Sequence, residues 1–113
     1  TCALPISEMS ILSIGGHMHD FGSSMFTYWQ PPEGDVMAIY DVPDWHPNYR
    51  YEPPVSQYNL GEVLVEEGQL VDVECNWYNA STQTLGYPEE MCTIFGVATP
   101  LEEGFFCDGG TVL

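Results

Sequence analysis

Turn-forming residues interrupt this chain so often that the segments between them are typical of short strands. The nine prolines and eleven glycines gather in turns such as QPPEGD at 30–35, VPDWHPN at 42–48 and GYPEE at 86–90. No segment long enough for a helix shows sustained apolar spacing of three and four, whereas LVDVECNWY at 70–78 alternates with period two over its first half. The pattern therefore predicts strands joined by turns.

The number of strand-like runs predicts an all-β fold. We expect an antiparallel β-sandwich or jelly roll, formed as a single domain by residues 1–113. A chain of this length can bury a core of its own. The seven predicted strands cover residues 9–14, 24–29, 36–42, 49–52, 61–65, 70–78 and 92–99.

The charge of the chain is strongly one-sided. There are 17 Asp and Glu residues against one basic residue, Arg50, which gives a formal net charge of -16 with His neutral. Nucleic acid is excluded as a partner, because phosphate binding depends on Lys and Arg. So much negative charge repels itself, and we expect calcium or other cations on the acidic surface. No apolar run reaches the length of a membrane span.

The cysteine content indicates an oxidising compartment. Cys2, Cys75, Cys92 and Cys107 lack the C-x-x-C spacing of zinc and redox sites, and three pairings are possible. An even number of cysteines in a small acidic domain favours two disulfides and a secreted, extracellular protein. Asn79 opens an NAS glycosylation pattern, which agrees with export. The sequence starts at Thr1 rather than at Met, so we expect a processed or excised piece of a longer protein.

Two of the three histidines lie one residue apart, in SIGGHMHDFGSS at 13–24. Side chains at i and i+2 of a strand leave the same face, so His17 and His19 would direct both imidazoles at one point. The pair is either a metal-ligand arrangement or the ordinary polar alternation of a half-exposed strand. Met91 precedes Cys92, and a disulfide there would fix the backbone that carries the thioether. Two histidines and a methionine form a nitrogen and sulfur set that suits copper, especially Cu(I).

Four segments, taken together, resemble a known copper domain. In order and spacing they are similar to the second, oxygen-activating domain of the copper type II, ascorbate-dependent monooxygenases, the family of the peptidylglycine alpha-hydroxylating and dopamine beta-monooxygenases. The resemblance implies a jelly-roll sandwich and one copper ion bound by His17, His19 and Met91. It also implies the disulfides Cys2–Cys107 and Cys75–Cys92. The segments are HMHDFGSSM at 17–25, where Gly22 follows the second histidine by three residues, DWHPNYRYEPP at 44–54, LVDVECNWYN at 70–79 and LGYPEEMC at 85–92.

The chain departs from this family at the residues that hold the substrate in its peptide-hydroxylating members. Gly15, Thr93 and Phe95 stand where those members have Arg, Asn and Tyr, so recognition of a peptide carboxylate is not expected. The family also uses a second copper, bound by three histidines in a preceding domain that lies outside these 113 residues. His46, the third histidine, is more typical of a turn residue.

Two functions of different classes fit these observations. In the first, the chain is the oxygen-activating copper domain of a monooxygenase that hydroxylates C–H bonds, with ascorbate as reductant and an upstream copper domain as partner. Alone it would bind copper and hydroxylate slowly or not at all, so the sequence does not decide whether it is an enzyme. The alternative is a non-catalytic structural subunit of an extracellular fibre or surface assembly, which self-associates through its sheet edges.

Carboxylates near the expected ligands are candidates to orient them. A ligating imidazole usually donates its other N–H to an acceptor outside the metal site. Asp20 follows His19 directly and should point to the opposite face of a strand. Glu89 and Glu90 precede Met91 and are better placed to lie beside the metal.

Overall fold

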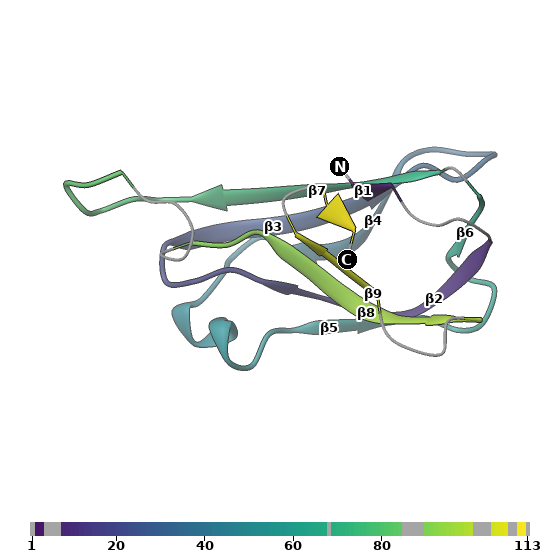
Figure 1. Cartoon of the computed structure of the whole chain (residues 1–113), viewed down its shortest axis with the longest axis horizontal. Helices are drawn as coiled ribbons and strands as arrows, with labels where there is room; N and C mark the ends of the chain where they lie inside the picture. The colour runs from purple at the N-terminus through teal and green to yellow at the C-terminus, as the bar shows by residue number, and fades with distance from the viewer. Residues whose placement is uncertain are drawn as a thin grey trace.

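Two antiparallel sheets pack against each other in the computed structural model of the chain, so the predicted β-sandwich is confirmed (Figure 1). Sheet A has the strand order β1-β7-β3-β4, and sheet B has the order β10-β9-β8-β2-β5, with β6 also paired to β2. The structure describes residues 2–3, 8–67, 69–84, 90–100, 105–108 and 111–112. Within these ranges it describes the side chains of all residues except Cys2, Ala3, Leu70, Asp108, Thr111 and Val112.

The strands are short, as the turns predict. They are β1 (Cys2–Ala3), β2 (Met9–His17), β3 (Gly22–Trp29), β4 (Met37–Val42), β5 (Val55–Gln57), β6 (Leu64–Val65), β7 (Leu70–Trp77), β8 (Thr93–Thr99), β9 (Phe105–Asp108) and β10 (Thr111–Val112), with a 3-10 helix, η1 (Pro47–Arg50), between β4 and β5. No helix in the described part of the chain is long and apolar enough to cross a membrane.

Alternation of side chains explains how sheet A covers the core. On β7, Val71 is buried while Asp72 and Glu74 on either side of Val73 are exposed. On β3, the inward residues are fully or almost fully buried, and the outward Phe26 and Tyr28 stack on each other with ring centroids 6.0 Å apart. The core between the sheets takes residues from both, including Met25 and Ile39 of sheet A and Ile11, Ile14 and Ile94 of sheet B.

The strand predicted over residues 49–52 is wrong. Residues 47–50 form η1 instead, which begins with Pro47 at its first turn, and the Tyr49 N–H donates to the His46 carbonyl at 2.9 Å. Proline fixes its own φ at a value that suits a helical turn and removes one donor from any strand ladder. The aromatic residues of this segment pack locally, since the rings of Trp45 and Tyr49 meet edge to face.

The Cys75–Cys92 disulfide joins the two sheets at one end of the sandwich. Cys75 lies on β7, and Cys92 immediately precedes β8, with Cα atoms 6.0 Å apart. This pairing, expected from the family resemblance, is present. The second expected pairing, Cys2–Cys107, lies partly outside the described residues, because the side chain of Cys2 is not described; Cys107 is buried and belongs to a disulfide.

Because of Tyr40, the stability of the fold should fall at alkaline pH. Its hydroxyl donates to the Pro54 carbonyl at 2.8 Å, the residue is 1% exposed, and burial raises the pKa of Tyr40 to about 12. An unfolded tyrosine ionises near pH ~10, so Tyr40 contributes stability below that pH that is lost as the pH rises through 12.

Tyr40→Phe is the variant that tests this dependence. It should lower the free energy of unfolding at pH 7 by about 1 kcal/mol, because the Pro54 carbonyl loses its donor. In urea unfolding experiments, the free energy of unfolding of this variant should also fall less between pH 10 and 12 than that of the wild type. Tyr51→Phe is the control, because Tyr51 is 77% exposed. Equal alkaline slopes for wild type and Tyr40→Phe would contradict the assignment.

Candidate metal site

Five parts of the chain meet at the end of the sandwich where β2 finishes. Figure 1 shows the carboxyl end of β2, the start of β3, η1, the end of β7 and the segment that enters β8 at the same end of the molecule. The two histidines belong to the first of these parts. His17 is the last residue of β2, and His19 lies in the turn that follows, which the Gly22 N–H closes by donating to the His19 carbonyl at 3.2 Å.

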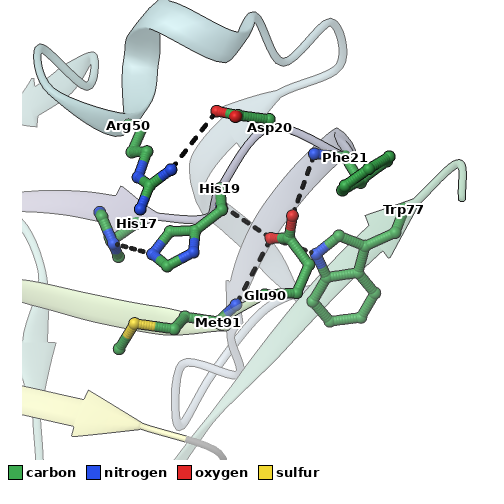
Figure 2. Close-up of polar contacts among 8 residues, drawn as sticks. All are labelled: His17, His19, Asp20, Phe21, Arg50, Trp77, Glu90 and Met91. Carbon is green, nitrogen blue, oxygen red and sulfur yellow. Dashed lines mark hydrogen bonds and ion pairs between the residues drawn. The ribbon is translucent and has the colours of Figure 1, made fainter. Parts of the chain in front are cut away.

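The imidazoles of His17 and His19 meet through their Nε2 atoms. These atoms lie 3.0 Å apart, and the rings stand edge to face, with centroids 4.8 Å apart (Figure 2). His17 is half-buried and His19 is 6% exposed. The predicted convergence of the two rings is therefore present, although strand β2 ends before His19. Met18 between them points into the core and is fully buried.

The spacing of the two nitrogens fits a shared metal ion. Imidazole nitrogens bind first-row metals at roughly 2.0–2.1 Å, so two that share one ion lie between about 2.9 and 4.2 Å apart, depending on the angle. The Nε2 atoms of His17 and His19 fall in this range. They lie at the short end of it, and at this distance one Nε2–H also donates a hydrogen bond to the other Nε2.

The surroundings of His17 favour its neutral form, which is the form that binds a metal. Burial lowers the pKa of His17, and the nearby His19 and Arg50 lower it further; a hydrogen bond to the Arg50 backbone and the Glu90 carboxylate act in the opposite direction. The net direction is downward. Protons therefore compete less for this imidazole than for an exposed histidine.

Met91 is the candidate third donor. Within the described residues no three His, Cys, Asp or Glu side chains gather as a metal-binding group. Figure 2 shows the Met91 side chain extending away from Trp77, toward the side of the view where the imidazole pair lies. Cys92, in the disulfide, fixes the backbone directly after it.

The carboxylate of Glu90 ties the histidine turn to the methionine segment. Its Oε1 accepts the backbone N–H of His19 at 2.7 Å and the indole N–H of Trp77 at 2.8 Å, and it lies 3.4 Å from the backbone nitrogen of Met91. Its Oε2 accepts the backbone N–H of Phe21 at 3.0 Å. The sequence predicts that Glu90 lies near the expected metal site, but it does not predict that its carboxylate accepts hydrogen bonds from His19, Phe21 and Trp77. Glu89 lies outside the described residues.

Arg50, the single cation of the chain, also lies beside this site. Its guanidinium is 3.8 Å from the carboxylate of Asp20, as Figure 2 shows. Both side chains are partly exposed, so the ion pair contributes little to stability. Asp20 is thus directed at Arg50, and it lies beyond the end of β2, so its direction is not set by a strand face.

The three positions that depart from the family pattern lie around the same strand ends. Gly15 pairs with Phe95 across β2 and β8, and His17 pairs with Thr93. A Cβ atom at Gly15 would come within 2.7 Å of the Phe95 ring, so the phenyl ring fills the space that a side chain at position 15 would need. The Thr93 hydroxyl is buried and has no partner among the described residues.

Gly22 has a packing reason to be glycine. A Cβ atom there would lie 2.8 Å from both the Met18 methyl and the Trp45 ring, and both side chains are buried. Gly22→Ala should therefore lower the free energy of unfolding by roughly 1–3 kcal/mol through overpacking, measured by urea unfolding. Ser23→Ala, at the exposed next position, is the control. Equal stability of the two variants would show that the space tolerates a methyl group.

An open cavity adjoins Met91 on the side of the β7 end. It has a volume of about 570 Å³. Trp77, Glu90, Met91 and Cys92 line it, and polar residues of the turn after β7 complete it. No basic side chain is among its lining residues, so it offers no cationic partner for an anionic group.

Asn79 and His46 each make local contacts within their own turns. Asn79 is exposed in the turn after β7, where its side chain accepts from Ser81 and donates to the Gln83 carbonyl at 2.7 Å; its glycosylation stays a prediction. His46 is exposed at the start of η1, and its ring packs against Tyr49. His46 is thus a turn residue, as the sequence indicates.

No protein-family model, curated protein or solved structure matches this chain.

Proposed function

We propose that this chain is a copper-binding domain of the kind that activates oxygen in the copper type II, ascorbate-dependent monooxygenases. The observation that carries the proposal is the approach of the His17 and His19 Nε2 atoms to 3.0 Å. This distance is short enough for both nitrogens to share one metal ion. The resemblance of HMHDFGSSM and LGYPEEMC to that family supplies the choice of metal and of Met91 as the third ligand.

The chemistry of the donor set supports copper over harder metals. Two imidazoles and a thioether favour Cu(I), whereas calcium and magnesium prefer oxygen ligands. The lowered pKa of His17 keeps its imidazole neutral, and the formal charge of -16 attracts a cation to the surface that bears the site. Copper bound there would supply one-electron and oxygen chemistry.

The protein's own part is to hold and shield the donors. His17 is positioned by the end of β2, and His19 by the turn that Glu90 anchors. Gly15 supplies no guanidinium to bind a peptide carboxylate, and the Phe95 ring lies where a Cβ atom at position 15 would be. The cavity beside Met91 gives a substrate a place next to the site. Electrons would come from ascorbate through a partner copper domain.

Competitive titration of the disulfide-intact chain with Cu(I), against a chromophoric chelator under argon, tests the proposal. We expect one Cu(I) per chain, bound far more tightly than calcium or magnesium ions added in excess. Purified chain that retains no Cu(I) in competition with the chelator would overturn the proposal. Turnover is not the test, because the chain alone is expected to hydroxylate slowly or not at all.

A further inference from the structure

We infer that Glu90 is a positioning residue that holds the histidine turn and the Met91 segment in register, so that nitrogen and sulfur donors reach one metal ion. The inference rests on the proposed function for the identity of the site. The contacts that support it are drawn in Figure 2.

Glu90 is a buried carboxylate surrounded by neutral donors. The residue is 8% exposed, and the one ion pair found among the described residues is that of Arg50 with Asp20. A buried charge without a cation is costly unless hydrogen bonds replace its water. Here the backbone N–H groups of His19 and Phe21 and the indole N–H of Trp77 do so, at 2.7, 3.0 and 2.8 Å.

These donors come from three separate parts of the chain, of which those of Phe21 and Trp77 also meet through the pairing of β3 with β7 and through the Tyr78 N–H, which donates to the Phe21 carbonyl at 2.9 Å. His19 is 71 residues away from Glu90 in sequence, Phe21 is 69 away and Trp77 is 13 away. They follow β2, precede β3 and end β7, so one side chain connects both sheets at the site. A side chain that only filled space would need none of these donors.

One oxygen atom couples the two kinds of ligand. Oε1 accepts from the backbone nitrogen of His19 and lies 3.4 Å from that of Met91. The same carboxylate oxygen therefore lies next to the backbone of His19, an expected nitrogen donor, and to that of Met91, the expected sulfur donor. A shift of this carboxylate would move one ligand relative to the other, while the His17 ring, at the end of β2, would keep its place.

Glu90→Gln separates this role from simple packing. The amide has nearly the same shape, but its NH2 group cannot accept a hydrogen bond, so at least one of the N–H groups of His19, Phe21 and Trp77 loses its acceptor. Glu74→Gln is the matched control, because it removes the same charge from an exposed position on β7.

The first readout needs no metal. In proton–nitrogen NMR spectra of the metal-free protein, Glu90→Gln should shift the His19 and Phe21 amide signals and the Trp77 indole signal, and should speed their hydrogen exchange. Signals of the core strands should stay in place. Unchanged signals at these three N–H groups would overturn the inference, whatever the protein binds.

The second readout is the Cu(I) site itself. Loss of outer contacts typically weakens metal affinity about 10–100-fold, and we expect a loss in this range for Glu90→Gln and none for Glu74→Gln. X-ray absorption should show that the variant loses the sulfur neighbour while it keeps nitrogen neighbours. A variant that binds Cu(I) with wild-type affinity and an intact sulfur neighbour would overturn the positioning role alone. A wild-type protein that binds no Cu(I) would overturn the proposed function.

Discussion

Replacement of His17 or His19 by alanine should abolish tight Cu(I) binding while the sandwich stays folded. Each substitution removes one of the two nitrogens that lie 3.0 Å apart. Loss of a direct ligand should cost more than the roughly 10–100-fold that follows loss of an outer contact. We therefore expect each variant to lose more than about 100-fold in Cu(I) affinity, measured by competition with a chelator.

His46→Ala is the matched control for these two variants. It removes an imidazole that is exposed at the start of η1 and packs on Tyr49, so it should leave Cu(I) affinity unchanged. Far-ultraviolet circular dichroism should show the same β signal in all three variants. Equal Cu(I) affinity in the His17→Ala, His19→Ala and His46→Ala proteins would contradict the assignment of the site.

Removal of the Cys75–Cys92 disulfide should lower the free energy of unfolding more than any of the other substitutions does. The bridge closes a loop with a sequence separation of 17 and connects β7 to the segment that enters β8. In the loop-entropy model such a bridge contributes about 3 kcal/mol. The Cys75→Ser, Cys92→Ser double variant should show this loss in urea unfolding at pH 7.

The same variant should also bind Cu(I) more weakly. Without the bridge, the backbone next to Met91 is no longer fastened to β7, and the thioether loses part of its pre-organisation. A double variant with wild-type stability would show that strand pairing alone holds this end of the sandwich. Full Cu(I) affinity in a destabilised variant would show that Met91 does not depend on the disulfide.

The sequence predicts the class of fold well because side-chain alternation and turn residues are local signals. Residues 70–78 alternate over the first half of the segment, and there β7 has the expected pattern, with Val71 buried and Asp72 and Glu74 exposed. The segment 49–52 has strand-forming residues, but Pro47 starts a 3-10 helix just before it. Short strands such as β5 (Val55–Gln57) were missed because three residues give no period to detect.

The candidate site was predictable only in part, for a physical reason. The spacing of His17 and His19 is a local signal, and their rings do converge. The role of Glu90 is not local, since its partners His19 and Phe21 lie 71 and 69 residues away. A buried carboxylate that accepts backbone N–H groups has the same sequence signature as a solvated glutamate in a turn. The relation between Gly15 and Phe95 was hidden likewise, because it depends on the pairing of β2 with β8.

X-ray absorption of the reduced, copper-loaded chain is the most direct test of the copper site. We expect one Cu(I) with two nitrogen neighbours from His17 and His19 and one sulfur neighbour from Met91. Met91→Leu should remove the sulfur signal and keep the nitrogen signals. A spectrum of oxygen neighbours only, or one that the His17→Ala, His19→Ala double variant leaves unchanged, would contradict the assignment.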